Sequence, residues 1–265
     1  GAKNMNAMIN FLPALTKPHT YLMMAYYPYA TQPNGEYGGQ GELQYKAKKG
    51  TKLGGKYGWE ATLNGSFAYG TDTTRIPATN DPKHYNYTIN YSNVFTKNSF
   101  FSPEDPRKYF SDVNLEFNTK FSKKVKMTLM YSHQYYNKNI VQFNSPNAGY
   151  DNIKTHIVVA DITWKYKTGS ALRFEAQTMQ THQDKGDWVV GLVEWTVSSH
   201  LFVTVLDQYN YGNPHKISTG RNILENNFNY PLLNLTYVSG PTRIVLQYGK
   251  QRAGIFCVGG VCRFV

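Results

Sequence analysis

Charged side chains are scarce in this chain of 265 residues, because Asp, Glu, Lys and Arg together make up only 17% of it. A soluble domain of ordinary composition carries about 25%. Long apolar runs are missing too: the longest, such as residues 157–160, fall far short of the roughly 20 residues of a transmembrane helix. The mean hydropathy is still −0.51, since uncharged polar residues and 22 Tyr fill the composition. These features exclude a helical membrane protein, a coiled coil and a disordered tail.

Motifs for common enzyme chemistry are also missing. The sequence has no Gly-x-Ser-x-Gly, His-Glu-x-x-His or phosphate-binding Gly-Lys-Ser/Thr motif. Polar residues such as Asp72 with Thr73, or His182 with Asp184, have no partner at a useful spacing. We therefore expect no enzymatic activity, no cofactor and no metal site. The first six residues show no signal peptide, which suits a cytosolic protein or a mature or partial chain.

Strict alternation of apolar and polar residues is the strongest positive pattern. Between Val113 and Phe121 the odd-numbered residues form one mainly apolar face, and the even-numbered residues form a polar face. This period is typical of a strand with one apolar and one polar face. It predicts eleven strands, most of them long enough to cross a bilayer at a tilt. They lie near residues 18–28, 37–48, 58–70, 108–122, 125–137, 154–166, 170–182, 187–198, 201–210, 228–239 and 242–252.

The connections between these strands alternate in length. Short turns lie at 122–124, 167–169, 198–200 and 239–241, with a somewhat longer Lys- and Gly-rich turn at 50–57; long connections lie at 71–107, 138–153 and 211–227. Two connections, 29–36 and 183–186, are exceptions, because they are short although they alternate into the places of long connections. Every second connection of a meander lies at the same end, so short and long connections separate. The sequence therefore predicts an all-β fold, an antiparallel up-and-down transmembrane β-barrel with short periplasmic turns and long extracellular loops.

Aromatic residues gather near the ends of the predicted strands. Rings with a polar group favour a membrane–water interface, which predicts two aromatic belts. The alternative is cross-strand aromatic pairing on a soluble sheet. The candidate interface aromatics are Tyr26, Tyr27, Tyr29, Tyr131, Trp164, Tyr166, Trp195, Tyr209 and Tyr248.

Four segments of the chain resemble an uncharacterised family of outer-membrane β-barrel proteins from Bacteroidota. They are residues 11–17, 27–36, 49–58 and 257–265. The resemblance implies a bacterial outer-membrane location and carries no catalytic residues. It also implies that residues 1–265 form a single β-barrel domain, the C-terminal part of a longer barrel whose final strand is missing. An odd strand count agrees, because isolated bacterial barrels have an even number.

The only two cysteines, Cys257 and Cys262, flank a Gly-Gly pair. They are too few for a disulfide scaffold and lack the second pair of a zinc site. Strand parity puts them on the extracellular side, where thiols meet oxidising conditions. We expect a disulfide within this loop, with two free thiols as the alternative.

Lysines concentrate at the short turns, and the formal net charge of the chain is +11. One interpretation is a basic mouth that favours anions or docks an acidic periplasmic partner. The other, which we favour, is that these lysines keep the barrel ends in water and block strand-edge pairing. Nucleic acid is not an expected partner, because the aromatics follow strand ends and not one basic groove. The turn lysines are Lys46, Lys48, Lys49, Lys52, Lys56, Lys120, Lys123, Lys124, Lys126, Lys165 and Lys167.

Together these patterns favour a porin-like passive channel or uptake pore. The main alternative is a structural or accessory barrel subunit of a larger outer-membrane complex, and a third is a soluble, glycan-binding β-sandwich. The expected partners are outer-membrane lipid and lipopolysaccharide, with other outer-membrane or periplasmic proteins as further candidates. The 71–107 connection, in which Tyr85–Phe95 alternates like a strand, could serve as a constriction or a contact surface.

Overall fold

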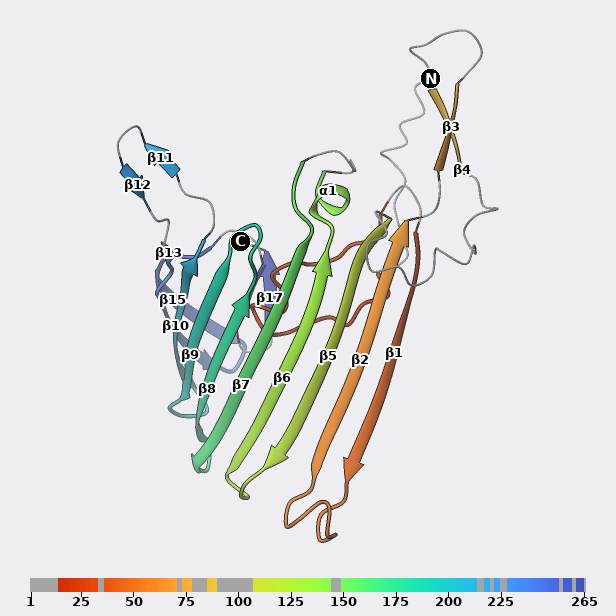
Figure 1. Ribbon diagram of the computed structural model, residues 1–265. Coiled ribbons are helices and arrows are strands. Elements are labelled where there is room, and N and C mark those ends of the chain that lie inside the picture. Colours follow the sequence, from red (N-terminus) through yellow and green to blue (C-terminus); the bar gives the residue numbers. More distant parts are fainter. Residues whose placement is uncertain are drawn as a thin grey trace.

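One antiparallel sheet dominates the structure, a computed structural model (Figure 1). Its 11 strands follow the chain in the order β1-β2-β5-β6-β7-β8-β9-β10-β14-β15, and β13 pairs with β10. The structure describes residues 14–32, 36–70, 73–77, 85–89, 107–143, 149–213, 217–219, 222–224, 228–252, 255–258 and 261–264. The prediction of an antiparallel up-and-down sheet is confirmed.

The sheet strands are long, and short turns join them at one end. Their bounds are β1 Glu36–Ala47, β2 Trp59–Gly70, β5 Lys108–Lys120, β6 Val125–Tyr136, β7 Ile153–Lys167, β8 Ser170–Gln180, β9 Asp187–Thr196, β10 Leu201–Gly212, β13 Phe228–Asn229, β14 Leu232–Ser239 and β15 Thr242–Gly249. Gly169 and Gly240 adopt positive φ in two of these turns, a conformation that glycine reaches without strain. Ten of the eleven predicted ranges therefore coincide with sheet strands, although 228–239 is broken at Tyr230 and Pro231 into β13 and β14.

Two short hairpins lie in the long connections, at the opposite end of the sheet from the short turns (Figure 1), and a third follows β15. They are β3 Thr73–Pro77 with β4 Tyr85–Ile89, β11 Ile217–Thr219 with β12 Asn222–Leu224, and β16 Ile255–Val258 with β17 Val261–Phe264. The strand expected over 85–95 is thus found over its first five residues, and the remainder lies outside the described residues. The helix α1, Lys138–Val141, is one turn long and is capped by Asn137, whose side chain accepts from the Ile140 amide. Among the described residues no helix is both long and apolar enough to span a membrane.

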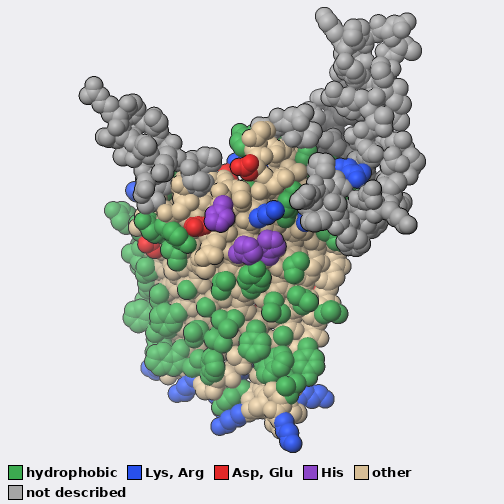
Figure 2. All heavy atoms as spheres, viewed as in Figure 1, with side chains coloured by type: hydrophobic (Ala, Val, Ile, Leu, Met, Phe, Trp, Pro, Cys, Tyr) green, Lys and Arg blue, Asp and Glu red, His purple; other side chains and the backbone are tan. Residues whose placement is uncertain are grey.

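The outer face of the sheet is exposed and largely apolar, whereas the inner face buries polar side chains beside an apolar cluster. On the inner face, Asn64, Asn114 and Thr155 are completely buried. On the outer face, Leu63, Leu115 and Val158 keep 44 to 48% of their surface exposed. Figure 2 shows the outer face as a broad band of apolar side chains, with Lys and Arg along the rim of short turns. A sheet that faces water would place these two sets of side chains the other way round.

The segment 14–32, which we call the inner segment, corrects the prediction of a strand over 18–28. It consists of turns and bends and lies against the inner face of the sheet. Pro18 and Pro28 cannot donate to a strand ladder. Residues 22–24 are buried one after another, without the alternation that a strand requires. Local bonds such as Ala25 N to Tyr21 O, at 3.0 Å, satisfy part of the backbone instead.

The sheet curls, so that β15 lies behind β8 and β9 (Figure 1). Its two edges are β1 and β15, and over the described ranges no strand pairing joins one edge to the other. Every residue of β15 is exposed on both faces. The antiparallel sheet is therefore established, whereas closure into a barrel and the single complete domain over 1–265 stay predictions.

The register of β16 and β17 bears on the predicted disulfide, because Cys257 and Cys262 are direct cross-strand partners. Residues opposite each other in an antiparallel pair have Cα atoms about 4.5–5.5 Å apart. A disulfide bridges Cα separations of about 4.4–6.8 Å. The backbone thus provides a separation that a disulfide requires, and the bond itself stays a prediction.

We expect the denatured, unreduced chain to resist alkylation by iodoacetamide, and the reduced chain to take up one adduct on each cysteine. The reason is that the hairpin register brings the two sulfur-bearing residues together in the folded protein. Intact-mass measurement of the alkylated chain, with and without prior reduction, counts the adducts. In Cys257→Ser the remaining thiol should react without reduction, and full alkylation of the unreduced parent chain would disprove the disulfide.

Candidate functional site

The candidate site is the inner face of the sheet together with the inner segment that crosses it. Partners of the inner segment come from β1, β5, β6, β7, β8 and the connection after β8. The curl of the sheet wraps these strands around the segment (Figure 1). The sequence separates the two parts widely, since the Tyr27 contact with Asp184 spans 157 positions.

The middle of the inner segment combines apolar packing with backbone hydrogen bonds to side chains of the sheet. Leu22, Met23 and Met24 are almost fully buried in one cluster with apolar residues of the inner face. The Met23 amide donates to Gln177 Oε1 at 2.8 Å, and Gln134 Nε2 donates to the Met24 carbonyl at 2.9 Å. These two glutamines therefore replace the strand partners that the segment lacks.

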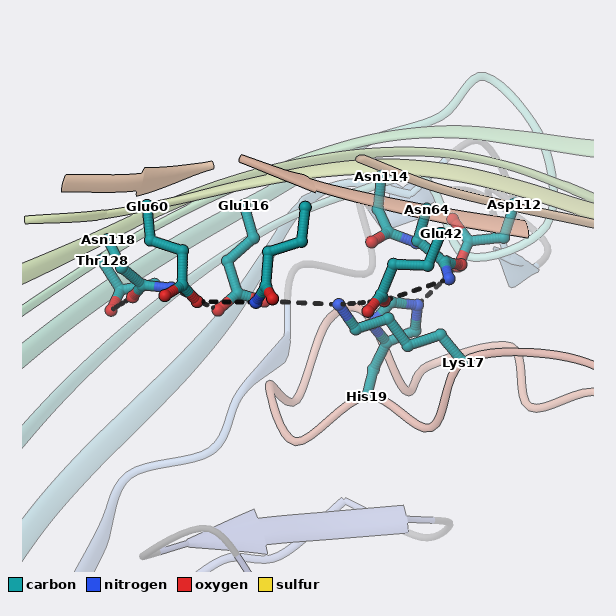
Figure 3. A network of polar contacts seen from close by, with 11 residues as sticks. Lys17, His19, Glu42, Glu60, Asn64, Asp112, Asn114, Glu116, Asn118 and Thr128 are labelled. Carbon is teal, nitrogen blue, oxygen red and sulfur yellow. Dashed lines mark hydrogen bonds and ion pairs between the residues drawn. The ribbon is translucent and has the colours of Figure 1, made fainter. Parts of the chain in front are cut away.

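Ion pairs fix the start of the inner segment to β1 and β5 (Figure 3). Lys17 Nζ lies 3.4 Å from Glu116 Oε2 and 3.6 Å from Glu42 Oε2. His19 Nε2 lies 2.5 Å from Asp112 Oδ2, in a pair that is almost wholly buried. A carboxylate buried to this extent needs such partners, since an unpaired charge in the interior is strongly destabilising.

Asp112 is the centre of a wider polar network on the inner face. Ser132 Oγ donates to Asp112 Oδ1 at 2.7 Å, and Asn114 Nδ2 donates to Oδ2 at 3.2 Å. Figure 3 shows the network continuing along the strands through Glu116 and Asn118. Four strands, β1, β2, β5 and β6, and the inner segment thus share one connected set of polar contacts.

A second ionic group lies on β7, β8 and β9. Arg173, on β8, contacts Asp161 at 3.0 Å and Glu194 at 2.7 Å, and it also pairs with Glu175. Tyr21 of the inner segment donates to Asp161 Oδ2 at 3.1 Å. One guanidinium therefore bridges three strands, and the inner segment joins the group through a phenol.

The far end of the inner segment is aromatic and corrects part of the interface prediction. Tyr26, Tyr27 and Tyr29 do not end a strand; they lie on the inner side of the sheet, a position incompatible with an outward belt. Tyr27 donates to Asp184 Oδ2 at 3.0 Å, and Tyr29 donates to Glu36. Burial raises the pKa of Tyr26 to about 12, and the Arg252 guanidinium lies 3.9 Å from the centre of its ring.

The other candidate aromatics lie on the sheet strands, with rings on the outer face. Trp195 Nε1 donates to the Tyr166 hydroxyl at 2.9 Å, which ties together two strands near the short turns. Their role at a membrane interface stays a prediction. Large exposed surfaces on this face belong to Tyr131, Trp164, Trp195, Tyr209 and Tyr248.

The chemistry that the site offers is polar contact through paired charges and amide groups. Across the residues that the structure describes, no group of three or more His, Cys, Asp or Glu side chains is arranged to hold a metal ion. Nearly all charged groups of the inner face are paired with one another, and the turn lysines are exposed at the other end of the same strands. The inner face can therefore bind polar groups, and in this structure the inner segment occupies part of it.

Sequence reasoning identified the polar face but missed the segment that covers it. The alternation of the sequence puts Arg173, Glu116 and Asp161 on the polar side of their strands, and the structure confirms this. The two prolines at 18 and 28 were the available signal, since proline is unfavourable within a paired strand. The contacts of the inner segment with β7 and β8 join residues more than a hundred positions apart, so no local sequence pattern predicts them.

Asp112→Ala should lower the free energy of unfolding by about 3 kcal/mol or more, because it leaves His19, Ser132 and Asn114 without their shared acceptor in a buried site. Chemical denaturation of the full chain measures this. The neighbouring outer-face substitution Ser111→Ala is the control and should change stability by no more than about 0.5 kcal/mol. Equal effects of the two substitutions would show that the network contributes nothing specific.

Comparison with known proteins gives a family and no function. Searches of curated proteins and of solved structures found no match. A family model described as a family of unknown function, DUF6029, matches residues 2–265. Since that match covers almost the whole sequence, the chain belongs to the DUF6029 family.

Proposed function

We propose that this protein is an outer-membrane β-barrel protein of a bacterium, from Bacteroidota, that provides a path for a small polar solute. In this proposal the outer face of the sheet contacts lipid, and the polar inner face lines the path. The inner segment narrows the path, so the protein acts as a restricted pore and not as a wide open porin.

The observation that carries the proposal is the exposed apolar band on the outer face, combined with buried polar groups on the inner face. Burying apolar side chains is the main driving force of folding in water, yet here they are exposed in a continuous band while amides and carboxylates are buried. Such a band is stable when lipid covers it. Exposed lysines at the short turns suit the adjoining water and headgroup layer.

The inner segment supports a restricted path and argues against a wide one. It meets the inner face through ion pairs at Lys17 and His19 and through buried apolar residues 22–24. A solute that follows the inner face would have to pass beside this segment or displace it.

Lipid contact is testable with the tryptophans, because Trp195 is 43% exposed on the outer face whereas Trp188 is 2% exposed on the inner face. We expect brominated lipids to quench a variant that retains only Trp195, and to leave a variant that retains only Trp188 largely unquenched. The measurement is fluorescence of each variant, with its other tryptophans changed to Phe, in vesicles. Equal quenching of both, or full solubility of the folded chain without detergent or lipid, would contradict the proposal.

The path itself is testable in planar bilayers. The double substitution Lys17→Ala/His19→Ala removes the ion pairs that hold the start of the inner segment, so we expect a higher conductance or more frequent opening than in the unaltered chain. Lys123→Ala, at an exposed turn, is the control and should conduct like the parent. If neither the parent nor the double variant conducts although both are folded and inserted, the path is closed and the pore function is wrong.

A second candidate function is a structural or accessory subunit of a larger outer-membrane assembly. The observation in its favour is the edge strand β15, whose eight residues are all exposed. Such an edge is a template for pairing with a strand of another protein. The absence of current from an inserted, folded chain would favour this alternative.

A further inference from the structure

Four cationic or cation-forming side chains meet on the outer face of β5, β6 and β7. We call them the outer cationic cluster: Lys108, His133, Lys154 and His156. His133 is the direct cross-strand partner of His156, and Tyr135 is the partner of Lys154 in the same pairing. Lys108 Nζ lies 4.6 Å from the centre of the Tyr135 ring. The register thus gathers residues from three strands at one place.

The two histidines are arranged so that each presents one free ring nitrogen. Their rings stack with centroids 4.5 Å apart. His133 Nδ1 donates to the Thr155 carbonyl at 3.0 Å, and His156 Nδ1 lies 2.9 Å from the Tyr131 hydroxyl. Both Nε2 atoms have no partner among the described residues. When Tyr131 donates to Nδ1 of His156, the ring proton lies on Nε2, where it can be donated to a ligand.

Among the described residues, no carboxylate balances this cluster. None of the four side chains forms an ion pair with Asp or Glu within the described part of the chain, in contrast to Lys17, Lys46, Lys138 and Arg173. Among the described residues, the ionisable groups that lie around His133 are His156, Lys108 and Lys154, which are all basic. Like charges held together repel one another, so an anion bound among them would be stabilised.

The cluster lies at the margin of the apolar band, on the side away from the short turns. Along their strands, Tyr131 and Val158 are the next outward residues after His133 and His156, and both are exposed apolar positions. Figure 2 shows histidine and lysine side chains together just above the green band. From His156 to Lys167 at the turn, a strand tilted by about 40° and rising about 3.3 Å per residue covers about 28 Å along the membrane normal. This distance is close to the thickness of a bilayer's hydrocarbon core.

We propose that the outer cationic cluster binds the phosphate of a lipid headgroup in the leaflet on the side of the long connections. The inference rests on the proposed membrane insertion. Lys108 and Lys154 supply charge, and Nε2 of His156, which carries the ring proton when Tyr131 donates to Nδ1, supplies a directed hydrogen bond. His133 stacks on the His156 ring and holds it in this position. Charge-assisted bonds of this kind are the strong ones in phosphate recognition. In an outer membrane, the matching chemistry is a phosphorylated glycolipid.

The test is binding of lipid A to the full chain in detergent micelles, followed by native mass spectrometry and by thermal shift. Lipid A that carries its phosphates should bind and stabilise the parent chain, while lipid A stripped of phosphate should bind weakly and inorganic phosphate alone should not stabilise it. Lys108→Gln/Lys154→Gln should weaken binding of the phosphorylated form by about tenfold or more, which is the loss expected for one or more charge-assisted contacts.

The matched control is Lys123→Gln/Lys167→Gln, which removes the same charge from the short-turn end and should leave binding unchanged. Lys154→Gln alone, at an exposed position, is the second variant if the half-buried Lys108 proves necessary for folding. Equal binding of both lipid A forms, or equal losses in the cluster and control variants, overturns the inference. A parent chain that inserts into vesicles but fails this test overturns the lipid site alone, whereas a parent chain that does not insert overturns the proposed function as well.

Discussion

The register of the antiparallel strand pairs is the constraint on which the remaining structure depends. Successive side chains of a strand point to opposite faces, so a slip of one residue would turn every inward group outward. In the β6–β7 pair the register runs unbroken from Val125 opposite Trp164 to Tyr136 opposite Ile153. That single alignment places Gln134 and Asp161 beneath the inner segment and the two stacked histidines on the outer face. The face on which each charged or polar side chain lies therefore follows from the pairing register.

The inner face shows how such a sheet is stabilised by an apolar cluster and by polar networks side by side. Where the inner segment is apolar, methionines and leucine pack on isoleucine, valine and methionine of the strands. Elsewhere, ion pairs and amide hydrogen bonds fill the space, and Asp112 and Arg173 each join several elements. Polar networks of this kind stabilise a structure only when their members are satisfied, so the loss of one member affects several partners at once.

The sequence was sufficient for the sheet and insufficient for what lies inside it. Long alternating segments such as Val113–Phe121 predicted strand positions, the direction of each face and the separation of short from long connections, because these properties are local. The assignment of 18–28 as a strand was wrong. Closely spaced Tyr and Met residues favour a strand, but the two prolines are unfavourable in one, and the partners that hold this segment are distant in the sequence. Tyr26, Tyr27 and Tyr29 were misplaced for the same reason. The pairing of His133 with His156 depends on register, which no single strand reveals.

The position of the inner segment in the chain has a consequence for the order of folding. It precedes every sheet strand in the sequence, yet Met23 and Tyr27 are held by residues 154 and 157 positions later. These two contacts become available only after β8 and the connection that follows it are in place. Contacts between distant residues form slowly, because the intervening chain must first be ordered. The middle and the far end of the inner segment therefore dock after the strands that follow them in the chain, and until then this part of the inner face is open to water and to other molecules.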